Sequence, residues 1–450
     1  MIPSPRQMRR NLDITDQWGK LEYSGWQDEN LSWKEDCYIG DWSWLLELRI
    51  SGPEALSLLS ALAVNGFRRY PAGQAKHGVF CSFEGKVIGD GILLRLGEDE
   101  FELQARGPVL DWLEWNAETR GYKATVERLH RKAKFQVSGL SALYLVESLA
   151  GKSLRELRFM RAGEAVIDGI PVSLLRQGMA GEIGFEIQGP IGEADKIRRA
   201  VLEAGRQFNI RRMGSRTAMI NHLEGCFPTR THDYLPAITG EAERDFWEAR
   251  YRPLPEGAAP DEFESFDSYF KVKGSYEAQD PSGWFHSPVE LGWSNRITFD
   301  HDFYGREALE KEAANPKRRM ATLIWNSEDV IDVYASLFRP GKPYDFMDIP
   351  RQQWHCDYAS KVMLGDRLCG VATSRGYSYY FRQMLSHGIL DVDVCVPGTE
   401  VAVIWGDPGS PQKRVRAVVA KSPYKYDKRH SDLTALPERL EQIPRDRPRD

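Results

Sequence analysis

The sequence lacks the features of a chain that enters a membrane. Nowhere among its 450 residues do about eighteen apolar side chains follow one another, the length that a transmembrane helix needs. The first residues, MIPSPRQMRRNLDITD, contain no apolar core of the kind that a secretory signal requires. We therefore expect a soluble, cytoplasmic protein without a membrane partner.

Cysteine is scarce, and the usual ligand and cofactor motifs are missing. The six cysteines include no CxxC pair, so the sequence predicts neither a zinc knuckle nor a disulfide framework. The nine histidines form no HExxH or similar cluster, and no GxGxxG or Walker loop occurs. We expect reduced thiols, no metal site and no nicotinamide chemistry.

An excess of charge of one sign is also absent. The chain has 60 basic and 65 acidic residues, a net charge of −5, and no long basic block. Proteins that bind nucleic acid concentrate positive charge to neutralise phosphates. The composition therefore predicts no nucleic-acid partner, and it leaves the oligomeric state open.

The patterns that are present predict several domains of mixed structure. A chain of 450 residues is too long for one ordinary core. Helices are expected after Gly52-Pro53 and after Gly107-Pro108, with strands over 86–96, 101–106, 170–176 and 183–188. After residue 316 the pattern changes to turns and short strands, which indicates a small antiparallel barrel or sandwich; the strands are expected over 362–364, 368–372, 385–392, 401–405 and 415–420. Residues 252–279 show no period, as in a lid or an ordinary long loop.

Two carboxylates occupy unusual positions in predicted strands. In Phe185-Glu186-Ile187 the alternation places Glu186 opposite two apolar side chains, where it either binds two parallel N–H donors of a planar ligand or faces water. In VIGDGI the same alternation places Asp90 on the face of Ile88 and Ile92, unless a Gly-Asp-Gly turn forms there. Glycines flank both carboxylates and permit close backbone approach.

Arg106 ends a predicted strand just before a helix. A guanidinium at that place can bind a carboxylate in a cleft. The alternative is a surface arginine paired with Glu102 or Asp111.

Several stretches, in order and well spaced, resemble a known family. GKVIGDGI, FELQARGPVLDWL, GMAGEIGFEIQGP and Gly214-Ser215-Arg216 are similar to the folate-binding aminomethyltransferase (glycine-cleavage T-protein) superfamily. HGVF, FDHDFYGREALE and Tyr334-Ala335-Ser336-Leu337-Phe338 more narrowly resemble the tetrahydrofolate-dependent aryl O-demethylases that act on vanillate, 3-O-methylgallate and syringate in lignin breakdown. The resemblance covers nearly the whole chain.

The resemblance implies an α+β, T-protein-like three-domain ring with tetrahydrofolate in its central channel. Residues 1–50 and 135–250 would form a split folate-binding α+β domain, and residues 51–134 a second α+β domain. Residues 251–316 would be a connecting or lid segment, and 317–450 a C-terminal antiparallel β-barrel. The implied reaction transfers the methyl group of a methoxylated aromatic acid to N5 of tetrahydrofolate, giving 5-methyltetrahydrofolate and a phenol.

The resemblance also assigns roles to individual residues. Glu186 matches the glutamate that holds the pterin, and Arg216 matches an arginine that contacts folate. Asp90 matches the acidic residue near the reacting nitrogens, and Arg106 matches the arginine that binds the aromatic carboxylate.

The chain departs from the demethylase pattern at two places. The tyrosine expected after Leu235-Pro236-Ala237-Ile238 is Thr239 here, so Tyr234 is the predicted replacement donor, with His232 and Tyr251 as alternatives. Trp42 and Trp44 stand where the demethylases have a glutamine and a histidine facing the substrate, which predicts a more apolar, ring-stacking wall.

Three functions remain open from the sequence. The first is O-demethylation of a methoxylated aromatic acid. The second is demethylation of a sulfonium or quaternary ammonium donor, whose neutral leaving group needs no acid and whose charge two tryptophans could hold. The third is folate binding without methyl transfer, as in the iron–sulfur assembly relatives of the superfamily, whose cysteine motif is absent here although Cys226 occupies a similar place.

Overall fold

The structure is a computed structural model that describes residues 20–179, 181–230, 232–251, 271–277, 284–351 and 356–438. Most of the unpatterned stretch at 252–279 lies outside these residues. The prediction of a lid or long loop there therefore falls outside the described part of the chain. No helix in the described ranges is long and apolar enough to cross a membrane.

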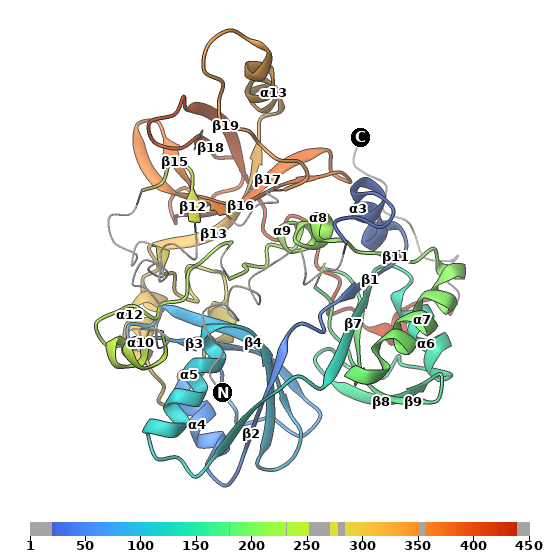
Figure 1. Ribbon diagram of the computed structural model, residues 1–450. Helices are drawn as coiled ribbons and strands as arrows, with labels where there is room; N and C mark the ends of the chain where they lie inside the picture. The colour runs from blue at the N-terminus through green and yellow to red at the C-terminus, as the bar shows by residue number, and fades with distance from the viewer. Residues whose placement is uncertain are drawn as a thin grey trace, which may run out of the picture.

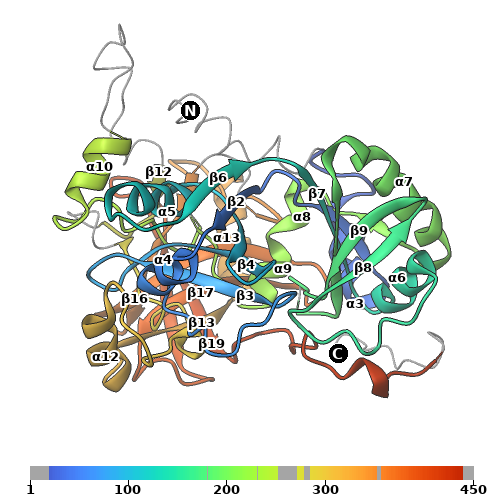
Figure 2. The ribbon, with the colours of Figure 1, turned by 90° about the horizontal axis from the view of Figure 1, so that it is seen from below.

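The first sheet has six strands and is covered on its outer side by helices α6 (Ala142–Ala150) and α7 (Ala194–Gly205), as Figure 2 shows. Phe185 and Ile187 pack into the core beneath these helices, so the intervening Glu186 points away from them. The strand order is β11 (Arg211–Arg212), β1 (Tyr38–Asp41), β7 (Lys132–Ser138), β10 (Gly184–Pro190), β9 (Ile170–Leu175) and β8 (Ala162–Ile167).

The second sheet has five strands and packs against α4 (Ala55–Leu62) and α5 (Pro108–Thr119). Helix α4 begins two residues after Gly52-Pro53 and α5 begins at Pro108 itself, and Trp112 is fully buried as expected. The strand order is β3 (Ala75–Cys81), β4 (Val87–Arg95), β5 (Glu100–Ala105), β2 (Leu46–Ser51) and β6 (Thr125–Leu129). Because β2 belongs to this sheet, the chain changes sheets between β1 and residue 46, a few residues before the boundary expected at residue 50.

The C-terminal region forms a closed antiparallel barrel of six strands, which confirms the fold class. The sequence predicted its later strands and missed the first one. Around the barrel run β13 (Arg318–Trp325), β17 (Gln383–Asp391), β16 (Arg367–Ser378), β15 (Ser360–Leu364), β18 (Glu400–Trp405) and β19 (Lys413–Ala420).

The two sheets and the barrel surround a central region, into which the short helices α8 (Ser215–Ala218) and α9 (Ile220–Glu224) project (Figure 1). Buried Glu224 connects these parts. It accepts hydrogen bonds from Trp33 Nε1 (2.9 Å) and Lys34 Nζ (2.7 Å) in α3 (Trp26–Glu35), and from Ser378 Oγ of the barrel (2.6 Å). Removing one partner of such a buried network leaves the others uncompensated, so the network holds the parts in one arrangement.

Candidate functional site

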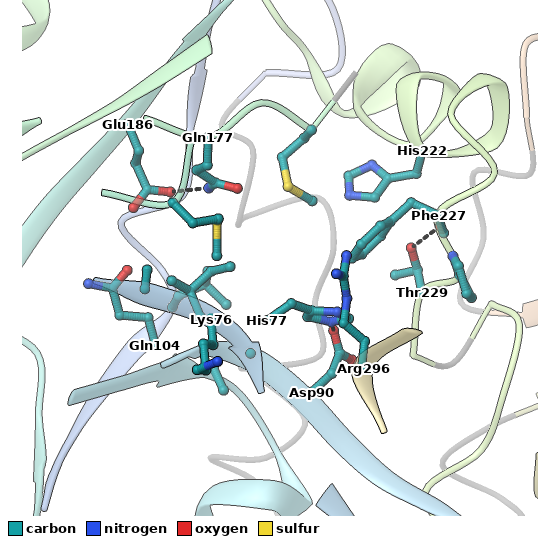
Figure 3. Close-up of a pocket in the computed structure, with 18 of the residues that line it drawn as sticks. Lys76, His77, Asp90, Gln104, Gln177, Glu186, His222, Phe227, Thr229 and Arg296 are labelled. Carbon is teal, nitrogen blue, oxygen red and sulfur yellow. Dashed lines mark hydrogen bonds and ion pairs between the residues drawn. The ribbon is translucent and has the colours of Figure 1, made fainter. Parts of the chain in front are cut away.

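A cavity of about 480 Å³ opens between the two sheets, a size typical of small-molecule sites. Both sheets and the connecting segment after α9 supply its polar groups. Figure 3 shows Glu186 and Gln177 on one side, His222, Phe227 and Thr229 on the other, and His77 with Asp90 between them.

Glu186 is buried, with 2% of its surface exposed, and it lines this cavity. Its Oε1 accepts a hydrogen bond from Gln188 Nε2 (2.6 Å), and its Oε2 accepts one from Gln177 Nε2 (3.2 Å). Burial raises the pKa of Glu186, and these two amides together with the charge of Lys134 oppose the rise. Each carboxylate oxygen keeps a second acceptor position for a ligand.

The position of Glu186 is fixed from the opposite sheet. Gln188 exchanges two hydrogen bonds with Gln104 of β5 (2.9 and 3.0 Å). Gln104 also donates to Glu102 (2.9 Å), which pairs with Lys132. This polar chain joins the two sheets at the cavity and holds the carboxylate in one orientation, because each member is already engaged.

Asp90 lines the same cavity and has two partners. His77 Nε2 lies 2.8 Å from its Oδ2, and the Tyr234 hydroxyl donates to its Oδ1 (2.5 Å). Burial alone would raise the pKa of Asp90, but these bonds and the charge of Arg230 hold the pKa below its ordinary value. Asp90 is therefore ionised at neutral pH.

The face on which Asp90 lies differs from the prediction. The register between β3 and β4 shifts so that Phe80 pairs with Gly89 and Cys81 pairs with Val87, leaving Ile88 as an extra residue. This irregularity turns Ile88 into the core under the helices, while Asp90 and Ile92 face the cavity. The prediction that all three share a face is therefore wrong for Ile88.

The flanking glycines pack against the protein and leave no open space. A Cβ on Gly91 would lie 2.6 Å from the Gln104 carbonyl oxygen, and one on Gly89 would lie 2.8 Å from Val109. These glycines let β4 approach β5 and α5 closely, and so place Asp90.

Sequence reasoning assigned no role to His77, the partner of Asp90. It lines the cavity, and its ring lies edge-on to Trp293 with 4.8 Å between ring centres. The HGVF stretch that contains it was one of the resembling motifs. The missing signal was spatial, because His77 pairs with Ile92 of the next strand and so faces the cavity beside Asp90.

Tyr234 is buried, with 2% exposed, and does not line the main cavity. Burial and the neighbouring charge of Asp90 raise its pKa, so the hydroxyl stays protonated and donates to Asp90. Tyr234 therefore acts on the cavity through Asp90.

Tyr234→Phe is expected to lower kcat about 10-fold or more, with little effect on ligand affinity, because a hydrogen bond to a charged group is lost. That bond lowers the pKa of Asp90, so its loss raises this pKa and moves the acid limb of the kcat–pH profile to higher pH. A pH series of kcat on both proteins measures the shift. An unchanged kcat and profile would remove Tyr234 from the mechanism.

Arg106, Trp42 and Trp44 come together at the cavity. All three line it, and the guanidinium carbon of Arg106 lies 4.9 Å from the centre of the Trp44 ring. Such stacking presents the edge of a guanidinium to a ligand while its face is held.

Arg216 is placed elsewhere. It forms an ion pair with Glu22 and donates to the Ile349 carbonyl (2.6 Å), and it is not among the described residues that line the cavity. The structure therefore does not bring Arg216 together with Glu186 and Asp90.

His222 is a second cavity histidine to which the sequence assigned no role. Its Nδ1 lies 2.7 Å from Asn221 Oδ1. Burial lowers the pKa of His222 to about 4. The ring is therefore neutral, and one of its two nitrogens can accept a hydrogen bond.

A family model and two relatives each match more than half of this chain. The sequence model of a family described as the GCVT N-terminal domain matches residues 11–242. A sesamin methylene transferase of Sinomonas sp. (strain No.22) is 32% identical over 430 residues, which cover 90% of each chain. A syringate O-demethylase of Sphingobium sp. (strain NBRC 103272 / SYK-6) is 31% identical over 427 residues, 90% of this chain and 89% of that one.

The fold is similar to a solved structure. The crystal structure of glycine cleavage system aminomethyltransferase T from Bartonella henselae superposes with a TM-score of 0.64. The match covers 90% of this chain and 91% of the other, at 20% sequence identity.

Proposed function

The chain belongs to the GCVT family, and from this premise we propose that it is a tetrahydrofolate-dependent O-demethylase. Its substrate would be a methoxylated aromatic acid, and its products 5-methyltetrahydrofolate and a phenol. The proposal makes this reaction a cytoplasmic step in the breakdown of lignin-type aromatic compounds.

The observation that carries the proposal is the pair of carboxylates in one cavity. Glu186 offers a buried carboxylate with one acceptor position open on each oxygen, which suits the parallel N–H donors on the aminopyrimidine edge of a pterin. No ion pair with Glu186 occurs within the described part of the chain, so a ligand can use the carboxylate without displacing a cation. The residues present therefore fit tetrahydrofolate.

Asp90 then lies at the reacting end of the site. Bound tetrahydrofolate supplies the N5 nitrogen that accepts the methyl group. Asp90, held ionised by His77 and Tyr234, is placed to take up or orient a proton there. The two sheets align the methyl acceptor with the methyl donor. Such alignment has a large effect on the rate of a reaction between two bound molecules.

Arg106 is the proposed contact for the carboxylate of the substrate, with Trp42 and Trp44 beside the ring. Arg106→Ala should raise KM for a methoxybenzoate about 10-fold or more, since a charged hydrogen bond is lost. KM for the matching methoxyphenol, which has no carboxylate, should change little. If KM for the carboxylated substrate stays unaltered in steady-state assays, Arg106 does not bind it.

A sulfonium or quaternary ammonium donor is the second candidate, and the absence of the Tyr234 hydroxyl from the cavity lining favours it. The charge of the cavity opposes it. Arg106, Arg230 and Arg296 all line the wall and would repel a cationic donor. We therefore rank the aromatic acid first.

The test is an anaerobic incubation with tetrahydrofolate and a panel of methyl donors, followed by mass spectrometry of the folate. The panel holds methoxybenzoates, methoxyphenols, and sulfonium and ammonium compounds, and also a methylenedioxy aromatic compound because of the sesamin relative. Product from a methoxybenzoate supports the proposal, and product only from charged donors moves the protein to the second candidate. Folate binding without product from any donor would leave a binding protein.

A further inference from the structure

Arg230 reaches the cavity from a turn that is anchored to the barrel. Asp233 in this turn accepts hydrogen bonds from Thr373 Oγ1 (2.7 Å) and from the backbone N–H of Thr229 (2.8 Å), and its Oδ1 lies 2.9 Å from His387 Nδ1. Thr373 and His387 belong to β16 and β17, in the wall of the barrel. Asp233 therefore ties the chain close to Arg230 to the wall of the barrel.

The guanidinium of Arg230 is buried but has no partner within the part of the chain that the structure describes. Only 7% of the residue is exposed, and it lines the cavity. Its acidic neighbours are Asp90 and Asp111. Both have closer partners, because Asp90 is bonded to His77 and Tyr234, and Asp111 pairs with Arg128 at 2.7 Å.

The backbone around Arg230 is shaped to admit it. A Cβ on Gly107 would lie 2.2 Å from Arg230 Nη1, so a larger residue there would displace the guanidinium from its present position. Gly107 also has φ +67°, a value that glycine adopts without strain. A buried cation without a partner is costly, which indicates that an acceptor on a ligand completes its hydrogen bonding.

The proposed reaction needs a donor near Asp90. An aryl methyl ether leaves as a phenolate, so negative charge develops on its oxygen in the transition state, and a fixed N–H at that oxygen lowers the barrier. Tyr234 cannot supply it, since its proton is donated to Asp90. His77 is also bonded to Asp90. Arg230 is the neighbouring cavity-lining donor whose N–H groups remain uncommitted among the described residues.

We propose that Arg230 is a catalytic residue that stabilises the leaving phenolate oxygen, in the role for which the sequence offered Tyr234. This inference rests on the proposed function. The C–O bond breaks with its electron pair left on oxygen, the methyl carbon bonds to N5 of tetrahydrofolate, and the proton released from N5 ends on the phenolate. The guanidinium stays protonated throughout and donates hydrogen bonds to that oxygen.

The test uses the full-length protein and methoxybenzoates whose phenol products differ in acidity, with single-turnover rates at saturating tetrahydrofolate. For the substrate with the least acidic phenol, Arg230→Met should lower the rate about 10²- to 10³-fold, as losing an oxyanion donor does. The loss should shrink steadily as the phenol becomes more acidic, because such a leaving group needs less help. The rates of Arg230→Lys should lie between those of the wild-type protein and Arg230→Met, and its loss should follow the same trend with phenol acidity.

Arg244→Met, at an exposed position in α10 (Arg244–Arg250), is the matched control and should leave the rates unchanged. Thermal unfolding and tetrahydrofolate binding establish that the variants are folded. If Arg230→Met does not fold, Arg230→Lys carries the test. A loss of rate that is equal across the series overturns the proposal. A rise in KM for carboxylated substrates alone also overturns it, and makes Arg230 a ligand of the substrate carboxylate.

Failure of the proposed function gives a different result. In that case the wild-type protein itself forms no 5-methyltetrahydrofolate from any methoxybenzoate, and the role of Arg230 falls with it. Wild-type turnover combined with an Arg230→Met rate equal to wild type overturns the Arg230 proposal alone.

Discussion

Glu186→Gln should weaken tetrahydrofolate binding about 10- to 100-fold, because a charged acceptor in a buried site is replaced by a neutral amide. The carboxylate has two acceptor positions open, and glutamine turns one of them into a donor that opposes the pterin N–H. Titration calorimetry under anaerobic conditions measures the change. Glu164→Gln, at an exposed site in strand β8 of the same sheet, is the control and should bind like wild type.

The affinity should also depend on pH in a defined direction. Burial raises the pKa of Glu186, so as pH falls this group takes up a proton before an ordinary glutamate does, and the binding form is lost. Tetrahydrofolate affinity should therefore decline on mild acidification in the wild-type protein. Glu186→Gln should lack this part of the pH dependence. Near-wild-type affinity of this variant at neutral pH would refute the role of Glu186.

The second large effect is expected for Asp90→Asn, which should lower kcat about 10²- to 10⁴-fold, the usual range for losing a group that handles a proton. Asparagine also has only one acceptor oxygen, whereas Asp90 contacts His77 through one carboxylate oxygen and Tyr234 through the other. Tetrahydrofolate affinity should change far less, because Glu186 is the proposed main contact of the pterin. Single-turnover and binding measurements on one preparation separate the two quantities.

Asp99→Asn is the matched control for Asp90→Asn. Asp99 lies exposed in the turn between β4 and β5, so the same chemical change there should leave kcat unaltered. If Asp90→Asn retains wild-type kcat, Asp90 does not take part in the reaction.

The sequence predicted correctly those structural elements that a short stretch of neighbouring residues determines. Alternation in FEI placed Glu186 opposite the core, and Gly-Pro pairs marked the starts of α4 and α5. The strand β13 was missed because it opens with charged residues, and its pairing with β17 and β19 lies far along the chain. For the same reason the expected boundary at residue 50 fell inside β2, whose partners are β5 and β6.

The candidate site was predictable only in part, because its geometry comes from contacts between distant residues. Alternation alone misplaced Ile88, since an extra residue in β4 is visible only when β3 is paired with it. Arg230 stood in a stretch without a pattern, and its importance appears only once burial removes water from an unpaired guanidinium. Arg216 matched by motif, but its side chain pairs with Glu22 in space.

Transfer of a labelled methyl group tests the central claim most directly. A methoxybenzoate carrying ¹³C in its methoxy group is incubated anaerobically with tetrahydrofolate and either the wild-type protein or Glu186→Gln, at a folate concentration that does not saturate the variant. We expect ¹³C in 5-methyltetrahydrofolate, an equal amount of the corresponding phenol, and a much lower yield with the variant. Labelled carbon that stays in the ether, or that leaves it without entering the folate, would contradict the account.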